Sequence, residues 1–294
     1  MTVKREYPGQ SVLARALCLF TIPQLHAIAP RRPLWRQPAA ILALAWLAAV
    51  TLGAVFAPRL APEGPLIADP SRALMPPGLG GLLGTDALGR DMFTRLLWGG
   101  RWTLAMAAIA LALTIGLGLP LGLLAGSRGG VVDAVLMRLL DAWLAFPGLL
   151  LAMTVVAILG PGLLPAAIGV GLSAAAPYAR VARTTARAIR AQPYIEAARA
   201  LGASPWRIAV RHILPNAAPT LTAFALAQFA RVLLSGASLN FLGLGAPPGT
   251  PDWGAMLDDG RSYLRVAPWM ATFPGLVLTL TVLAANLLGD RVQE

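Results

Sequence analysis

The sequence predicts an all-α protein that crosses a membrane six times. Apolar residues make up 57% of its 294 residues, and charged residues make up only 13%. A soluble domain usually has a charged share of about 25%. The mean hydropathy is +0.67. The apolar residues are gathered in segments of roughly 20 residues, which is the length of helix that spans the hydrocarbon core of a bilayer.

The six predicted transmembrane helices cover residues 39–57, 102–126, 135–160, 164–179, 217–236 and 268–289. The first carries no charge and lies too far from the N-terminus to be a cleavable signal peptide. The third contains Pro147, which should kink it. The fourth is short and rich in Gly and Ala, so we expect it to be a buried helix that packs closely against a neighbour.

The distribution of positive charge predicts the orientation of these helices. Lys and Arg gather before the first helix, in the turn at 127–134 and in the loop at 180–216, whereas acids nearly match the arginines elsewhere. These three regions, and therefore both termini, should face the cytoplasm. The predicted division is an N-terminal segment 1–38 with a surface helix at 11–20, a first transmembrane helix 39–57, an extracytoplasmic loop 58–101, a five-helix core 102–289 and a C-terminus 290–294.

The net charge of +11 does not indicate a nucleic-acid partner, because the arginines lie between hydrophobic segments. The sequence also offers no catalytic or metal-binding constellation. A nucleotide-binding P-loop needs a lysine after its glycines, and the only lysine is Lys4. Cys18 has no second cysteine, and His26 and His212 lie far apart. We expect a chain that is not an enzyme and holds no cofactor or metal, so any ATP would be bound by another subunit.

Residues 196–215, EAARALGASPWRIAVRHILP, form a polar and basic island between apolar segments. Glu196 should lie in the first turn of one short helix, where a carboxylate favours the positive helix end. Gly202 permits a reversal, Ser204 and Pro205 begin a second short helix, and Pro215 ends it. The apolar residues of the second helix pack on the bundle or on a partner: Ile208, Ile213 and Leu214. The arginines of the island could pair with acids of a partner: Arg199, Arg207 and Arg211.

A solvated basic loop near anionic lipid is the alternative for this island. That alternative accounts for the arginines but not for Gly202 or for the helix-turn-helix layout. The sequence therefore favours a docking segment over a lipid-facing loop.

Three charged residues fall within predicted transmembrane helices: Arg138, Asp141 and Arg231. Such residues are functional candidates by default. Arg138 and Asp141 have the spacing of a local ion pair, which is at least as good an interpretation as contact with a solute. Arg231 is isolated and should face protein or a water-filled path.

Residues 84–91, GTDALGRD, form a tight polar turn on the outer side. Asp86, Arg90, Asp91 and Arg95 could form a network of ion pairs there. A purely structural role and a docking role are both open for this turn.

Four stretches in a fixed order carry a family resemblance: 84–91 (GTDALGRD), 133–151 (DAVLMRLLDAWLAFPGLLL), 196–215 and 240–253 (NFLGLGAPPGTPDW). Together they resemble the dipeptide, oligopeptide and nickel branch of ABC-transporter permeases, and more narrowly its second, C-type permease. The resemblance implies the type I ABC importer permease fold in a bacterial-type inner (plasma) membrane. It runs from the first predicted helix nearly to the end of the chain.

The resemblance implies a role for two groups of residues. The "EAA" loop would couple the permease to a separate ATPase through Glu196, Ala197, Ala198, Gly202, Ile208, Arg211, Leu214 and Pro215. The outer signature would lie near the solute entrance and the contact with a binding protein, through Gly84, Thr85, Asp86, Leu88, Gly89, Arg90 and Asp91.

The implied function is that of a permease subunit in an importer of peptides, nickel or a related small solute. The implied partners are a homologous second permease, two cytoplasmic ABC ATPases that bind ATP and Mg, an extracytoplasmic solute-binding protein and membrane lipid, with no nucleic acid. The solute itself is not identified by the sequence.

The sequence departs from the family pattern at Gly236, where the family usually has a glutamate, and at Asn240, which replaces a serine. It also stops sooner after Asp290 than is usual. The alternative function is an ion-driven secondary transporter, which would favour carboxylates at the bilayer midplane. Asp141 is the only reasonable candidate for such a carboxylate. A membrane scaffold or receptor would leave the 196–215 layout unexplained.

Overall fold

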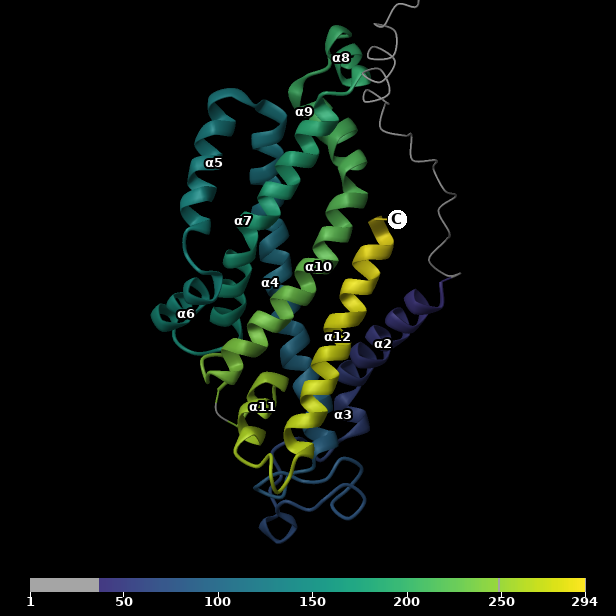
Figure 1. Cartoon of the computed structure of the whole chain (residues 1–294), viewed down its shortest axis with the longest axis vertical. Helices are drawn as coiled ribbons and strands as arrows, with labels where there is room; N and C mark the ends of the chain where they lie inside the picture. The colour runs from purple at the N-terminus through teal and green to yellow at the C-terminus, as the bar shows by residue number, and fades with distance from the viewer. Residues whose placement is uncertain (1–36, 248, 294) are drawn as a thin grey trace, which may run out of the picture.

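The computed structural model describes residues 37–247 and 249–293, and these residues fold as a bundle of helices (Figure 1). Across these two ranges the only β pairing is an isolated bridge between Thr85 and Asp91. The predicted all-α class is confirmed. Most of the predicted segment 1–38, including the surface helix at 11–20, lies outside the described residues.

Five helices are long: α2 (Pro38–Val55), α4 (Met92–Arg128), α7 (Leu163–Arg190), α10 (Leu214–Phe241) and α12 (Trp269–Gln293). The shorter elements are α3 (Ala57–Leu60), the 3-10 helix η2 (Pro70–Arg72), α5 (Gly130–Leu144), α6 (Gly148–Leu159), α8 (Pro193–Ala200), α9 (Pro205–Ile208), the π-helix η3 (Ala209–Ile213) and α11 (Trp253–Arg261). Helices α8 and α9 lie at one end of the bundle, and α11 and the loop before α4 lie at the other (Figure 1).

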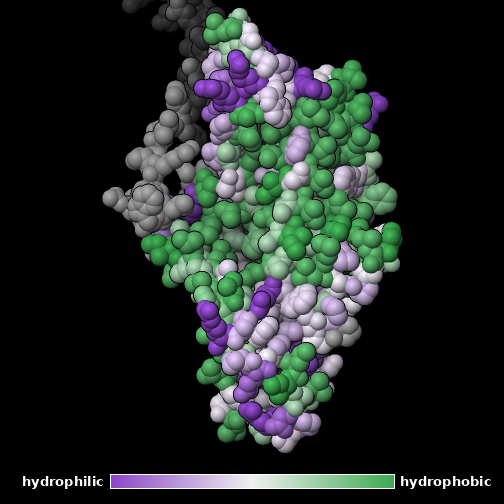
Figure 2. All heavy atoms as spheres, turned by 180° about the vertical axis from the view of Figure 1, so that it is seen from behind, coloured by the Kyte–Doolittle hydropathy of each residue, from purple (hydrophilic) through white to green (hydrophobic). Residues whose placement is uncertain are grey.

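Four described helical segments are long and apolar enough to cross a membrane: α2, α4, the continuous helix Pro205–Phe241 and α12. The pair α5 and α6 makes a fifth if it counts as one bent span. Helix α7 is about 42 Å long at 1.5 Å per residue, but its second half carries several arginines. On the face shown in Figure 2, apolar side chains cover most of the middle, and hydrophilic ones gather towards both ends. This is the surface of a multi-pass membrane protein; the count of six crossings stays a prediction.

The third predicted helix, 135–160, is not a single kinked helix. Helix α5 ends at Leu144 and α6 begins at Gly148, and their axes differ by 80°. Pro147 is the residue that precedes α6, and it has no N–H with which to continue the hydrogen bonding of α5. The sequence correctly located an interruption at Pro147, but it predicted a kink where the structure has a break between two helices.

Several helices run beyond the predicted apolar segments, because hydropathy marks the end of an apolar stretch rather than the end of a helix. Helix α7 runs to Arg190 instead of ending at 179, since arginine is a good helix former. Helix α4 starts at Met92, inside the predicted loop 58–101, because Asp91 caps it by accepting a hydrogen bond from the Thr94 N–H at 2.8 Å. Helix α12 extends into the predicted C-terminal segment 290–294.

Helices α4 and α7 are in backbone contact along a row of glycines. Gly118 and Gly126 of α4 face α7: a Cβ atom added to them would lie 2.7 Å from the Ala175 carbonyl oxygen and 2.6 Å from the Arg183 carbonyl oxygen, respectively. Gly171 of α7 approaches the Ala110 carbonyl in the same way, at 2.8 Å. Small residues at such spacing let helices associate closely in lipid. The predicted close packing of the fourth helix is confirmed.

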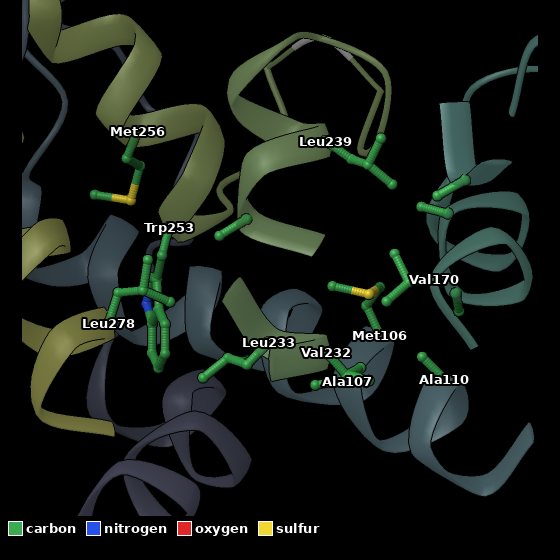
Figure 3. Close-up of a cluster of buried hydrophobic side chains, with 14 of the residues drawn as sticks. Met106, Ala107, Ala110, Val170, Val232, Leu233, Leu239, Trp253, Met256 and Leu278 are labelled. Carbon is green, nitrogen blue, oxygen red and sulfur yellow. The ribbon is translucent and has the colours of Figure 1, made fainter. Parts of the chain in front are cut away.

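The largest apolar core joins α4, α6, α7, α10, α11 and α12 (Figure 3). Trp253 of α11 lies in its centre beside Leu278, and the Trp253 indole N–H donates to the Leu96 carbonyl at 3.0 Å. Met106 and Val170 extend this core between α4 and α7. Because the core residues come from six helices, they hold the bundle together.

Candidate functional sites

The 196–215 island forms a helix, a turn and a second helix, as predicted. Helix α8 has Glu196 in its first turn. Gly202 has φ +81°, a left-handed conformation that favours glycine. The Ser204 side chain then caps α9 by accepting a hydrogen bond from the Arg207 N–H at 3.3 Å.

Pro215 does not end the second helix. Residues Pro205–Phe241 form one continuous helix, in which α9 passes through the π-helix η3 into α10. Pro215 lacks the N–H that would bond to the Arg211 carbonyl, and the wider π turn lies directly before it. The Asn216 amide donates to the His212 carbonyl at 2.6 Å in the same turn. The docking segment is therefore joined to α10 without a break.

Three isoleucines fix the segment to the bundle. Ile195 of α8, Ile208 of α9 and Ile213 of η3 are buried in one cluster with Ala186 of α7. The sequence allowed Ile208 and Ile213 to pack either on the bundle or on a partner. In the structure both residues pack on the bundle. Leu214 is half-buried. These isoleucines therefore anchor the segment to the bundle, while most of its other residues are exposed.

Most of the other predicted coupling residues are exposed to solvent. Glu196, Ala197, Gly202, Arg211 and Pro215 are exposed, and Ala198 is half-buried.

Two large apolar residues of this segment that the sequence analysis did not single out are also exposed: Leu201 is 89% exposed and Trp206 is 78% exposed. Their apolar character within a polar loop was the available signal. Exposed apolar residues grouped with polar ones mark interaction surfaces.

The segment and the cavity next to it also carry a cluster of arginines. A cavity of about 370 Å³ beneath the segment has Arg128, Arg190 and Arg199 among its lining residues. In the described ranges, no acidic oxygen lies within 4.0 Å of these arginines or of Arg207 and Arg211. An acidic partner surface would complement this charge.

At the opposite end, Asp86 is the centre of the outer signature. It accepts from Arg90 Nε and from Arg95, both at 2.6 Å, and from the N–H groups of Leu88 and Arg90, both at 2.9 Å. Arg95 also bonds Asp259 at 3.0 Å. The predicted network therefore exists, with one correction: Asp91 caps α4 and Asp259 joins the network.

The rest of the signature builds the same turn. Gly84 and Gly89 have φ of +79° and +74°, and the Thr85 carbonyl accepts from the Trp269 indole at 3.0 Å. Of the seven signature residues, only Leu88 is exposed. The geometry favours the structural alternative for most of them and leaves Leu88 available for contact.

Asp141 does not pair with Arg138. It forms an ion pair with Arg180 of α7, and Asp133 forms one with Arg183 one turn further along. The exposed Arg138 has no acidic partner among the described residues. The spacing of Arg138 and Asp141 predicted the wrong pair, because α7 extends far enough for its own arginines to reach the acids of α5. Arg231 is exposed on α10 beside a small cavity.

These features define a multi-pass membrane protein with an anchored, largely exposed helix-turn-helix at one end. The chain belongs to the family of binding-protein-dependent transport system inner membrane components, which matches residues 118–294, more than half of its length.

Curated relatives extend this match over most of the chain. The glutathione transport system permease protein GsiD of Pectobacterium atrosepticum is 43% identical over 212 residues, 72% of this chain and 70% of that protein. The dipeptide transport system permease protein DppC of Alkalihalophilus pseudofirmus is 37% identical over 275 residues, 92% of this chain and 90% of that protein.

Solved structures support the fold alone. A chain of the MetNI methionine ABC transporter in an inward-facing conformation has a TM-score of 0.56 at 23% identity, over 68% of this chain and 94% of that chain. A chain from an amino acid ABC transporter has a TM-score of 0.51 at 18% identity, over 65% of this chain and 89% of that chain.

The protein is therefore a permease subunit of an ABC importer, with the type I importer fold predicted from the sequence. Permeases of this family are not enzymes, because ATPase activity lies in separate subunits. The comparisons give the ion-driven alternative no support, and its candidate carboxylate, Asp141, is paired with Arg180. They also give no specific support to nickel.

Proposed function

We propose that this chain is one of two permease subunits of an importer for peptides or peptide-like solutes such as glutathione. The named relatives act on dipeptides and on glutathione, which supports this solute class. A homologous permease, two cytoplasmic ATPases that bind ATP and Mg, and an extracytoplasmic solute-binding protein complete the complex. Both termini and the α8–α9 segment face the cytoplasm, in keeping with the positive charge at that end.

One observation carries the coupling role: the docking segment and α10 share a continuous helix from Pro205 to Phe241. An ATPase that moves the segment would move α10 with it. The isoleucine cluster around Ile195 ties the same motion to α7. Rigid-body movement of packed helices is a common form of switching between two states. ATP binding would thus change the access of the path without chemistry in this chain.

The contact with the ATPase is formed by Trp206, Leu201, Glu196 and the surrounding arginines. The two apolar side chains would enter a groove of the ATPase, and the arginines would meet its acids. Buried aromatic anchors surrounded by polar contacts dominate the binding energy of many interfaces. The outer signature has a different role, which is to hold the entrance loop rigid and present Leu88 towards the binding protein.

The test is assembly and activity of the reconstituted complex. Wild-type chain, second permease and ATPases are co-purified, and ATP hydrolysis is measured with and without loaded binding protein. Trp206→Asp should abolish co-purification of the ATPases, because it places a carboxylate in the apolar contact. Leu79→Asp is the matched control, because Leu79 is 80% exposed but lies in the loop at the opposite end.

Two further variants separate docking from insertion. Glu196→Lys and Gly202→Asp should abolish uptake and uncouple ATP hydrolysis while the protein still inserts in the membrane. Gly202→Asp acts through the left-handed backbone at this turn. Normal transport by both variants, or a wild-type chain that transports with an ion gradient and ignores ATP, would overturn the proposal.

A further inference from the structure

Arg231 is a charged residue within α10, which is part of a candidate transmembrane helix, and it has no charged partner among the residues that the structure describes. It lies about 26 Å along α10 from Leu214 and about 15 Å from Phe241, at 1.5 Å per residue. An arginine near the centre of a membrane helix is costly, and such residues usually face protein or a water-filled cavity. Among residues 37–247 and 249–293, no acidic oxygen lies within 4.0 Å of its guanidinium group. A compensating group must come from elsewhere.

A cavity of about 250 Å³ adjoins Arg231, between the start of α6, α7 and α10. Its polar lining consists of Ser173, Gln228, Arg231 and Ser235. Gln228 is only 1% exposed, and its Nε2 donates to the Ala174 carbonyl at 3.3 Å. Its Oε1 is buried and accepts no hydrogen bond within the part of the chain that the structure describes. A buried acceptor without a donor is costly, so this cavity has a place for an N–H or O–H group.

The break between α5 and α6 creates this cavity, and Gly148 keeps it open. Gly148 is the first residue of α6 after the break. A Cβ atom at Gly148 would lie 3.4 Å from Ser173 Cβ and 3.6 Å from Ser173 Oγ. A longer side chain would therefore extend into the cavity. Val170 and Val232 form its apolar wall, and both belong to the core (Figure 3).

The lining has a definite chemical preference. A guanidinium group binds a carboxylate through two parallel hydrogen bonds, and the free Gln228 oxygen accepts from an N–H donor. We propose that this cavity is a transient binding site on the transport path for a carboxylate and the amide N–H next to it, as found at the C-terminal end of a peptide. This inference rests on the proposed function and names the part of the solute that Arg231 receives.

Accessibility provides the first test, on the complete complex with its two permeases and ATPases. In a Cys18→Ser background, the Arg231→Cys variant supplies a thiol at this position. This thiol should react with a methanethiosulfonate reagent that carries a sulfonate group, and is therefore membrane-impermeant, in at least one nucleotide state. A thiol that stays unreactive in the apo, ATP-bound and vanadate-trapped states would place residue 231 against lipid or buried protein and overturn the inference.

Uptake into proteoliposomes provides the second test, with radiolabelled dialanine and glutathione as probes. Hydrogen bonds to charged groups contribute about 1.5–3 kcal/mol, so Arg231→Gln should lower uptake about ten-fold or more. Arg231→Lys should keep part of the activity, and Gly148→Leu should lower uptake by filling the cavity. Ser238→Ala is the matched control on α10, because Ser238 does not line the cavity and its hydroxyl donates to the Leu234 carbonyl of the same helix; its uptake should be unchanged.

The outcomes separate this inference from the proposed function. A wild-type complex that takes up neither probe contradicts the peptide-type solute class. Wild-type uptake that is unchanged in both Arg231→Gln and Gly148→Leu overturns the carboxylate site alone. An Arg231→Gln chain that no longer co-purifies with the second permease would show that Arg231 pairs with an acid of that subunit, which also overturns the site.

Discussion

Met106 of α4 occupies the space beside Gly236 of α10. A Cβ atom added to Gly236 would overlap Met106 Cε and lie 2.7 Å from Met106 Sδ. Met106 is buried in the core that joins these helices. Gly236 is also the position where the resembling family usually carries a glutamate. The methionine and the glycine therefore form a complementary pair that leaves no room for that side chain.

Restoring a glutamate at this position should destabilise the protein. Gly236→Glu forces Met106 aside and introduces a carboxylate into the core, so we expect a loss of about 3 kcal/mol or more. Met106→Ala alone should cost about 2–5 kcal/mol through its cavity. In the double variant the losses should fall at least ~1 kcal/mol short of their sum. Thermal unfolding of the purified chains in detergent measures all three, and strict additivity would contradict the pairing.

The buried ion pair between Asp86 and Arg95 should contribute far more to stability than an exposed ion pair. Arg95 is 2% exposed and bonds Asp86 at 2.6 Å. Asp86→Ala leaves this arginine buried without its main partner, which should cost about 3–5 kcal/mol. Asp258→Asn is the control, because Asp258 and Arg261 form a pair at the surface that should contribute at most about 1 kcal/mol. Equal losses in thermal unfolding would contradict this account.

Local features of the sequence predicted what local interactions determine. Gly202 and the Ser204 cap are set by residues within four positions of each other, and both were located correctly. The apolar segments gave the fold class for the same reason, because a bilayer selects helices by length and hydropathy.

Features that depend on distant residues were not accessible in the same way. Arg95 meets Asp259 at a sequence separation of 164 residues, and Asp141 meets Arg180 across 39. The exposure of Trp206 depends on how the isoleucine cluster turns the segment. Spacing alone cannot supply such contacts, so the local pair of Arg138 with Asp141 remained a reasonable but wrong expectation.

Asp252 should give the protein a pH-dependent stability. It lies between α10 and α12, outside the predicted transmembrane helices, and caps α11 through the Gly254 N–H at 2.8 Å. Burial raises the pKa of its carboxyl group, although hydrogen bonds from Thr103 and Gly254 oppose the shift. A raised pKa in the folded state favours the protonated form. The protonated Asp252 carboxyl group therefore contributes stability that is fully present below its pKa in the unfolded chain, about 3.9. This stability is lost as the pH rises through the higher pKa of the folded protein.

The measurement is the unfolding temperature of wild type and variants from pH 5 to pH 8. Asp252→Asn keeps a neutral cap, so it should unfold at a temperature that falls less with rising pH than that of wild type. Asp252→Ala should lose the cap and about 1 kcal/mol at every pH. If Asp252→Asn had the same pH slope as wild type, Asp252 would not be the titrating group.

Two glycines in α4 should respond in opposite directions to the same substitution. At Gly122 an added Cβ would lie 2.6 Å from Ala182 Cβ and 3.0 Å from the Arg183 nitrogen, and it would overlap the Ala179 carbonyl. At Gly116 nothing lies within 4 Å of the added atom. Gly116→Ala should therefore stabilise the helix by up to about 1 kcal/mol, which is the difference in helix propensity.

Gly122→Ala gains the same propensity but must push α4 away from α7, so we expect a net loss of about 1–3 kcal/mol. The separation should also disturb the ion pairs that α7 makes with α5, because Arg183 lies on the displaced stretch. Thermal unfolding of both variants in one detergent compares them directly. If Gly122→Ala proved as stable as Gly116→Ala, the two helices would not be in backbone contact, and the glycine row would have no part in holding α7 against α4.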